Sequence, residues 1–170
     1  MLIQQNVNGT DAFNRSWAEF KVGFNDTRGN YWLGNDLLSQ LTESGRYKLR
    51  FDLQARGNLS WYWAEYSSFV VHSEATNYTL LVTGYSGNAG DALYWHDNAM
   101  FTTYDRDNDP WTASFWNNNC AVLNGGGFWY TTACSRASVN TVRGTNIGFG
   151  WFTRQRRYIS LQSTRMWLMC

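Results

Sequence analysis

The sequence predicts a single α+β domain, with a central antiparallel sheet, short helices and a loop-rich second half. Three observations support this fold class. Apolar side chains recur at helical spacing before residue 46, they alternate with polar ones over residues 46–87, and residues 84–150 are rich in Gly, Asn, Asp and Thr. A chain of 170 residues suffices for one domain with a sizeable core, and no repeat or linker divides residues 1–170.

Two short helices are expected in the first quarter of the chain. Residues 11–24 place three aromatic rings three or four positions apart, so the rings share one side of a helix. Residues 34–45 begin with Asn35 as an N-cap, continue through three leucines and end at Gly45. Both segments are therefore predicted to pack one apolar side against the sheet.

The strands are expected in the middle and at the end of the chain. Residues 46–55, 61–73 and 77–87 have the period of two that is typical of strands, and only short turns separate them. Consecutive strands with short connections predict an antiparallel meander. Residues 157–169 return to the same alternation and are expected to add another strand.

The loop-rich half needs something to hold it together, because long loops without regular structure are uncommon in compact domains. Cys120 and Cys134 flank a glycine-rich loop with no His nearby, which favours a disulfide over a metal site. The third cysteine, Cys170, is left over and is expected to be unpaired within the domain.

Three carboxylates lie at alternate positions in the same half. Asp105, Asp107 and Asp109 share one face if the segment is extended, and without a partner they repel each other. The spacing is not that of an EF-hand, because a proline and a tryptophan stand where that loop needs Gly and Glu. Calcium accepts carboxylate and carbonyl oxygens in other loops as well. A calcium site, a solvated acidic turn and pairing with Arg106 all remain open.

Composition argues against several classes of protein. The formal net charge is +1, and no large basic face indicates a nucleic-acid partner. No apolar run has the length of a membrane span, and the first residues lack the features of a signal peptide. Five glycosylation sequons nonetheless favour a secretory protein. They begin at Asn8, Asn14, Asn25, Asn58 and Asn77.

The sequence gives little support for an enzyme. There is no G-x-S-x-G elbow, the chain has two histidines, and Asp107 and Asp109 are neighbours rather than an opposed pair. The basic cluster of Arg154, Arg156 and Arg157 is most simply a solvated strand edge; binding of a sulfated sugar and cleavage by a protease are the alternatives.

Motifs along almost the whole chain resemble those of the fibrinogen C-terminal-type, or fibrinogen-related, domain of ficolins, tachylectins and angiopoietins. In chain order they are NRSWAEFKVGF, YWLGND, LTESGRYKLRFDL, YSGNAGDAL, HDNAMFTTYDRDND, NCA, GGFWY and YISLQSTRM. The resemblance implies an extracellular, non-catalytic binding module with a central antiparallel sheet and a loop-built, calcium-binding subdomain.

The resemblance also implies a set of calcium ligands. The family's two Asp ligands fall on Asp107 and Asp109, and its main-chain carbonyl ligands fall on Trp111 and near Ala113, so Asp105 is a neighbour rather than a ligand. We expect the weak affinity of extracellular modules, roughly 0.1–1 mM. The family further implies a cis peptide bond between Ala133 and the second cysteine of the disulfide.

The chain departs from the family pattern in several places. The family's leading segment has no counterpart, so we expect a domain shortened at its N-terminal side. The loop over residues 110–119 is longer than usual. Asn124 and Ser135 stand where acetyl-binding lectins of the family have Tyr and His, and a family Tyr falls on Arg143. The position of the pocket therefore carries over, but its acetyl specificity does not.

The resulting hypothesis is a secreted, calcium-stabilised recognition module, lectin-like and bound to glycans, glycoproteins or other pattern ligands in innate immunity. Ring faces of Trp129 or Tyr130 are expected to stack on the ligand, and Arg143 to favour an anionic one. The expected pocket comprises Asn124, Trp129, Tyr130, Ala133, Cys134, Ser135, Arg143, Phe149 and Trp151. The alternatives are a receptor- or matrix-protein-binding domain of the angiopoietin or tenascin kind, and homo-oligomerisation.

Overall fold

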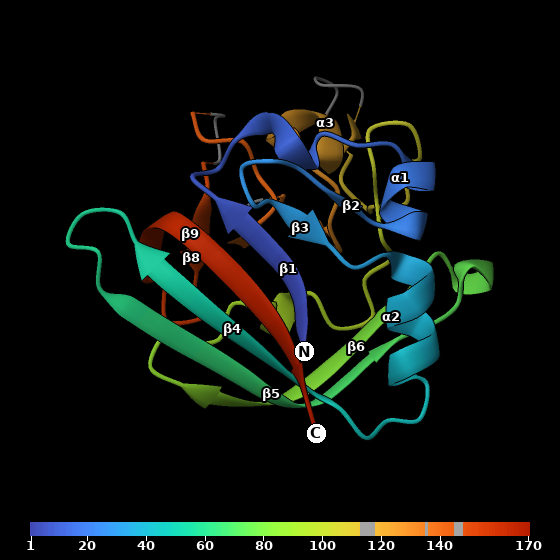
Figure 1. The fold of residues 1–170 in the computed structure, drawn as a ribbon, viewed down its shortest axis with the longest axis horizontal. Coiled ribbons are helices and arrows are strands. Elements are labelled where there is room, and N and C mark those ends of the chain that lie inside the picture. Colours follow the sequence, from blue (N-terminus) through green and yellow to red (C-terminus); the bar gives the residue numbers. More distant parts are fainter. Residues whose placement is uncertain (113–117, 135, 145–147) are drawn as a thin grey trace.

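The computed structural model describes residues 1–112, 118–134, 136–144 and 148–170 and has the expected α+β architecture around an antiparallel sheet (Figure 1). Ala113 and Ser135 lie outside the described residues. The strands are β1 (Leu2–Val7), β2 (Phe24–Asn25), β3 (Tyr31–Trp32), β4 (Lys48–Ala55), β5 (Trp61–Val71), β6 (Leu80–Gly87), β7 (Ala137–Ser138), β8 (Gly150–Phe152) and β9 (Tyr158–Met169). The α-helices are α1 (Trp17–Val22), α2 (Asn35–Thr42) and α3 (Cys120–Asn124), and 3₁₀ helices cover Asp11–Phe13, Glu74–Thr76 and Leu93–Trp95.

The strand order is β2-β3-β1-β9-β4-β5-β6, with β7 and β8 joined to it through β9. The meander β4-β5-β6 confirms the prediction from alternation. The last strand, β9, lies between β1 and β4, so the two ends of the chain pair in the middle of the sheet (Figure 1). The amino group of Met1 donates to the carbonyl of Leu168 at 2.7 Å.

The first strand was not predicted, and its inward-facing residues explain why. Gln4 and Asn6 on β1 are fully buried, so amides stand where a strand pattern has apolar side chains. Both side chains form hydrogen bonds with residues of the loop half. The Gln4 Nε2 donates to the Asn140 Oδ1 at 2.9 Å, and the Asn6 Nδ2 donates to the carbonyl of Val139 at 2.9 Å. The sheet and the loops are thus joined by hydrogen bonds as well as by apolar contact.

The two predicted helices form, but both are shorter than expected. A 3₁₀ turn precedes α1, whose start is held by a capping box between Ser16 and Glu19. Gly34, not Asn35, is the N-cap of α2, because the Asn35 Oδ1 accepts a hydrogen bond from the Trp32 indole at 3.0 Å. The two helices lie side by side along one flank of the sheet (Figure 1).

Buried aromatic rings fill the space between helices, sheet and loops. The ring centroid of Phe101 is 5.1 Å from that of Phe20 and 5.0 Å from that of Trp129, and Trp32 is 6.0 Å from Trp129. All four side chains are at most 1 % exposed. Such tilted and edge-to-face pairs are the favourable arrangements of aromatic rings. Much of the aromatic composition therefore belongs to the core.

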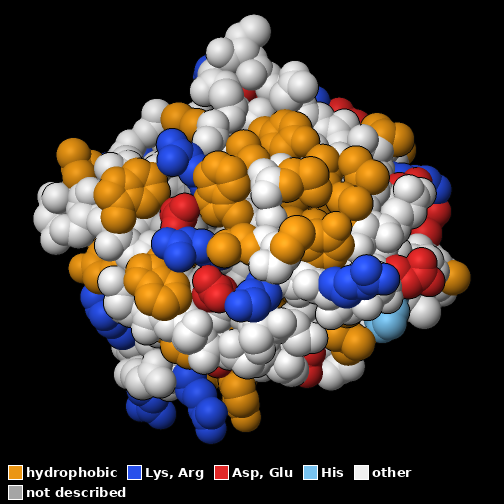
Figure 2. All heavy atoms as spheres, turned by 60° about the horizontal axis from the view of Figure 1, so that its bottom comes forward, with side chains coloured by type: hydrophobic (Ala, Val, Ile, Leu, Met, Phe, Trp, Pro, Cys, Tyr) orange, Lys and Arg blue, Asp and Glu red, His pale blue; other side chains and the backbone are white. Residues whose placement is uncertain are grey.

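Other rings stand on the outward side of the central strands. The Arg50 guanidinium lies 5.1 Å from the ring centroid of Trp63, and that of Arg165 lies 5.5 Å from Trp61, which is 47 % exposed. Hydrophobic side chains also gather in the middle of the face in Figure 2, with basic and acidic side chains beside each other around them. No helix within the described ranges is long and apolar enough to cross a membrane.

His96 forms hydrogen bonds that join its own segment to those of Trp129 and Ala137. Its Nδ1 donates to the carbonyl of Trp129 at 2.6 Å, and its Nε2 accepts from the amide of Ala137 at 3.2 Å, which requires a neutral ring. The ring is 1 % exposed, and burial lowers the pKa of His96 from 6.5 to about 4.

We therefore expect acid to destabilise the protein through His96. The unfolded chain takes up this proton near pH 6.5 and the folded chain only near pH 4, so stability that is present above pH 6.5 falls as the pH falls toward 4. The loss amounts to about 2 kcal/mol at pH 5. Urea unfolding at pH 7 and pH 5 measures it. In His96→Gln this part of the pH dependence should disappear; an unchanged pH dependence would contradict the assignment.

Candidate calcium segment and adjoining pocket

The three alternate carboxylates have different surroundings. Asp105 does not face its neighbours: its Oδ1 accepts from the amide of Trp17 at 2.9 Å and from the Thr103 hydroxyl at 2.7 Å. The first of these bonds ties residue 105 to the beginning of α1, 88 positions earlier in the chain. Asp105 is thus used for tertiary structure, which leaves Asp107 and Asp109 as the pair with shared surroundings.

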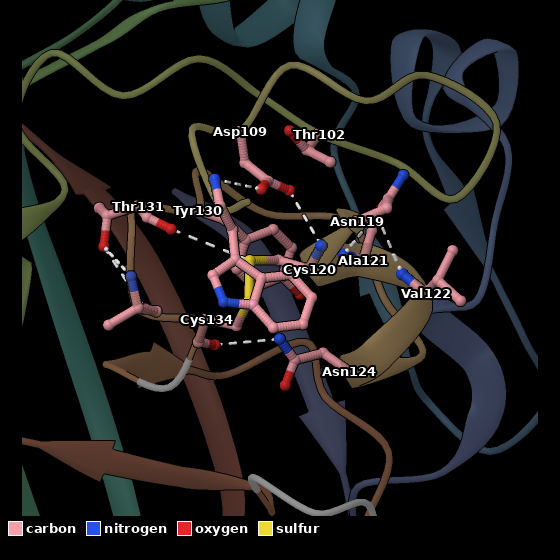
Figure 3. Close-up of a disulfide and its surroundings, with 12 residues drawn as sticks. Thr102, Asp109, Asn119, Cys120, Ala121, Val122, Asn124, Tyr130, Thr131 and Cys134 are labelled. Carbon is pink, nitrogen blue, oxygen red and sulfur yellow. Dashed lines mark hydrogen bonds between the residues drawn. A yellow bond between two sulfur atoms is a disulfide. The ribbon is translucent and has the colours of Figure 1, made fainter. Parts of the chain in front are cut away.

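Asp109 closes the segment that precedes the first cysteine. Its Oδ1 accepts from the amide of Trp111 at 3.1 Å and its Oδ2 from the amide of Cys120 at 3.0 Å, as Figure 3 shows for the bond to Cys120. Its own amide donates to the Asp107 Oδ1 at 3.2 Å. Burial, more than the neighbouring charge of Asp107, raises the pKa of Asp109 to about 6.

Arg106 is not the cation that offsets this pair. Its guanidinium stacks 4.0 Å over the ring of Trp17, donates to the Asn77 Oδ1 at 2.7 Å and lies 3.6 Å from the Glu74 carboxylate. Neither Asp107 nor Asp109 forms an ion pair with a described basic residue. Two adjacent carboxylates, one of them half-buried, are left without a positive charge.

These residues suit calcium better than a metal that prefers nitrogen or sulfur. Asp107 and Asp109 supply hard carboxylate oxygens, and the loop after them supplies main-chain carbonyls, which is the donor set that calcium takes. No cluster of three or more His, Cys, Asp or Glu that could hold a metal ion by side chains alone occurs in the described part of the chain, so a cation here would also need main-chain oxygens. Trp111 is half-buried against the core.

The predicted disulfide is present. Cys120 and Cys134 are joined, with 2.01 Å between the sulfur atoms, and Cys170 is free and exposed. Asn119 begins α3 beside it: its Oδ1 accepts from the amides of Ala121 and Val122, and its Nδ2 donates to the carbonyl of Thr103 at 3.0 Å. The disulfide, α3 and the acidic segment thus form one connected unit (Figure 3).

The prediction of a cis peptide bond before Cys134 is wrong. No cis bond occurs among the described residues, so the bond between Ala133 and Cys134 is trans. The trans form is strongly preferred for a peptide bond that does not precede proline, and the disulfide closes without the cis form here. Ala133 is half-buried, and its amide faces the Thr131 hydroxyl at 3.4 Å.

Most residues of the expected ligand pocket lie inside the protein. Trp129, Tyr130, Phe149 and Trp151 are at most 2 % exposed, so their ring faces contact the core and are not free to stack on a ligand. Asn124 is also fully buried: its Nδ2 donates to the carbonyl of Cys134 at 3.0 Å (Figure 3). The sequence could not show which of these rings the core would take, because burial depends on tertiary packing.

Arg143 turns away from the disulfide loop. Its Nη2 lies 3.4 Å from the Gln162 Oε1 of β9, and its amide donates to the carbonyl of Gly9 at 2.7 Å. Burial and the nearby charge of Arg56 lower the pKa of Arg143. An anionic ligand held by Arg143 against the disulfide does not fit this placement.

A pocket of about 540 Å³ lies beside the acidic segment; of the expected ligand-binding residues that the structure describes, Tyr130 lines it. It opens between the turn over residues 95–100, residues 108–110 and residues 130–132. Trp95, Met100 and Pro110 supply apolar surface, while Asp97 and Asp109 supply carboxylates. This composition suits a ligand group with an apolar face and hydrogen-bond donors, such as hydroxyl, amide or amine groups.

Replacing Asp105 should lower stability without changing any calcium site. Asp105→Ala removes the acceptor for the Trp17 amide and the Thr103 hydroxyl, which should cost about 1–2 kcal/mol. Thermal unfolding with and without calcium measures both effects. If the calcium-induced shift in the unfolding temperature is also lost, Asp105 takes part in calcium binding and is not only a structural residue.

Comparison with known proteins agrees with this architecture. The chain is 38 % identical over 162 residues to tenascin of Mus musculus and 41 % identical over 129 residues to angiopoietin-related protein 1 of the same species. These matches cover 94 % and 76 % of this chain but 7 % and 25 % of the relatives, so the chain spans a small part of each relative.

Solved structures give the same result. The fibrinogen-like globe domain of human ANGPTL2 superposes with a TM-score of 0.83 at 33 % identity, covering 98 % of this chain and 78 % of that one. Lamprey fibrin D-dimer, complexed with the peptide Gly-His-Arg-Pro-amide, superposes with a TM-score of 0.78 at 26 % identity, covering 98 % and 60 %. The family described as fibrinogen beta and gamma chains, C-terminal globular domain, matches residues 1–170, and the chain belongs to this family.

Proposed function

We propose that the protein is an extracellular, non-catalytic recognition module whose loop half is stabilised by calcium and binds glycans. The observation that carries the proposal is the open pocket of about 540 Å³ beside Asp109, whose lining combines apolar surface with two carboxylates. Sugars present apolar C–H faces and hydroxyl donors, which match the Trp95 ring and the two carboxylates. The disulfide and the five sequons support an oxidising, secretory environment.

Calcium would be held by the side chains of Asp107 and Asp109, with main-chain oxygens of Trp111 and Ala113 as further donors. It would supply the positive charge that these two carboxylates lack among their described neighbours. Because Asp109 also accepts the amides of Trp111 and Cys120, a cation at this point would stiffen one wall of the pocket.

The second candidate is recognition of a protein ligand through the same pocket. Relatives include tenascin and angiopoietin-related protein 1, and the lamprey relative is complexed with a peptide. The carboxylates of Asp97 and Asp109 would suit a basic or amine-bearing peptide group as well as a sugar hydroxyl. A receptor or matrix protein is therefore the alternative partner, and the choice is an outcome of the binding experiment below.

Calcium should stabilise the protein, and the effect should require Asp107. With a dissociation constant of roughly 0.1–1 mM, calcium at about 10 mM should add about 1.4–2.7 kcal/mol to the free energy of unfolding. Calorimetric titration and thermal unfolding measure the binding and the gain. Asp107→Asn should abolish both, whereas the matched variant Asp105→Asn should keep them. No heat of binding at millimolar calcium would rule out the calcium site.

Filling the pocket should abolish ligand binding while the fold remains. Thr132 is exposed and lines the pocket, so Thr132→Trp should place a large ring in it at little cost in stability. The control is Val122→Trp on α3, where the residue is 37 % exposed and outside the pocket. Glycan arrays and peptide panels, each with and without chelator, should show loss of binding in Thr132→Trp alone. Equal binding by both variants would exclude the pocket as the ligand site.

A further inference from the structure

Six arginines lie on the β4–β5 turn, on the β8–β9 turn or on segments that contact these turns and their strands. We call them the arginine belt; they are Arg56, Arg136, Arg143, Arg154, Arg156 and Arg157. The two turns are in direct contact, because the amide of Arg56 donates to the carbonyl of Ser160 at 2.9 Å. Arg136 is connected to β8, because its carbonyl accepts from the amide of Phe152 at 3.0 Å. Arg143 is connected to β9, because its Nη2 donates to the Gln162 Oε1 at 3.4 Å.

The charges of the arginine belt are not neutralised by carboxylates. None of its members forms an ion pair within the described ranges, whereas four of the six arginines elsewhere do; Arg46 and Arg165 are the two that do not. The residues outside the description, 113–117, 135 and 145–147, contain no Asp or Glu. A chain with a net charge of +1 thus concentrates unpaired positive charge on these segments.

Aromatic rings hold several of these guanidinium groups in place. The guanidinium of Arg136 lies between Trp95 and Phe152, 4.3 and 5.0 Å from the two ring centroids. Arg154 and Arg157 each lie over a tyrosine ring, at 4.2 and 4.9 Å. Stacking occupies the flat face of a guanidinium and leaves its N–H edge free to donate in pairs to a sulfate or carboxylate group.

A hollow of about 350 Å³ lies beside Arg157 of the arginine belt. It is lined by Tyr62, Arg157 and Tyr158 together with Gly57 and Asn58 of the β4–β5 turn. Tyr158 is 49 % exposed and so presents both ring surface and a hydroxyl group to a ligand. A sugar ring fits such a hollow, and its anionic substituents would then meet guanidinium groups at the rim.

We propose that the arginine belt and its hollow bind a sulfated polysaccharide. Bidentate pairing of arginine with sulfate supplies the attraction, and the tyrosine-lined hollow supplies the contact with a sugar ring that a charged surface alone lacks. This site is separate from the pocket beside Asp109, with which it shares no described wall except the Trp95 ring stacked on Arg136.

A sequon at the hollow has to be controlled in any binding test. Asn58 begins this sequon, and a glycan there would cover the hollow. The test therefore uses Ser60→Ala as the parent protein. This change removes the sequon but keeps the turn, because the Asn58 Oδ1 accepts from the main-chain amide of residue 60 at 3.0 Å.

The experiment measures heparin affinity and its dependence on salt. The test variant carries Arg154→Gln, Arg156→Gln and Arg157→Gln, and the control carries Arg28→Gln, Arg46→Gln and Lys48→Gln, so both variants have three fewer positive charges than the parent. At about 0.15 M salt the test variant should bind roughly tenfold or more weakly, and the control should match the parent. The slope of log affinity against log salt should fall by about one for each arginine that no longer pairs with a sulfate.

Several outcomes would overturn the proposal. Equally weakened binding in both variants would mean that net charge alone attracts heparin, and unchanged binding by desulfated heparin would exclude sulfate recognition. Single-stranded DNA binding as tightly as heparin would make the belt a general polyanion surface. Thermal unfolding shows whether the test variant is folded. If it is not, Arg154→Gln alone replaces it and should still weaken binding severalfold. Failure of the calcium or pocket experiments leaves this result unaffected.

Discussion

The loop half of this protein depends on the rule that buried backbone groups must be hydrogen-bonded. The described residues between β6 and β8 form little regular structure that could satisfy these groups, so polar side chains do it instead. Asn119 accepts from an amide at the start of α3 and donates to the carbonyl of Thr103. Asp109 accepts from two main-chain amides, and His96 donates to one carbonyl and accepts from one amide. Their longer bonds join loop segments 11 to 41 positions apart, and the side chains of Gln4 and Asn6 tie this half to the sheet.

The same polar side chains decide what the site can be. Because Asp105 holds α1 and Arg106 is used by Trp17, Asn77 and Glu74, the remaining pair of Asp107 and Asp109 is left with an uncompensated negative charge. Of this pair, Asp109 lines a pocket whose other walls come from the turn after Trp95 and the chain before Cys134. A cation there and a ligand in the pocket would act on the same loop, which is the physical basis for linking calcium to recognition.

Negative and positive charges lie in different places on this molecule. The acidic pair lies beside the pocket, and the arginine belt lies on the two turns and the segments that contact them, although the formal net charge is only +1. Aromatic residues have a similar double use. Phe101 and Trp129 build the core, while Tyr62, Trp95 and Phe152 carry guanidinium groups near the surface. Composition alone could not distinguish these uses, because a ring has the same hydropathy in either place.

The sequence by itself determined the fold class, the meander, the last strand and the disulfide, since alternation and a cysteine-flanked loop are local signals. The sequence did not predict β1, because Gln4 and Asn6 place amides at inward positions of that strand. Only the tertiary structure decided that Trp129 is core, that Arg143 points to β9 and that the open pocket lies beside Asp109. The reason is that burial and side-chain direction depend on which distant segments meet, and local spacing carries no record of that.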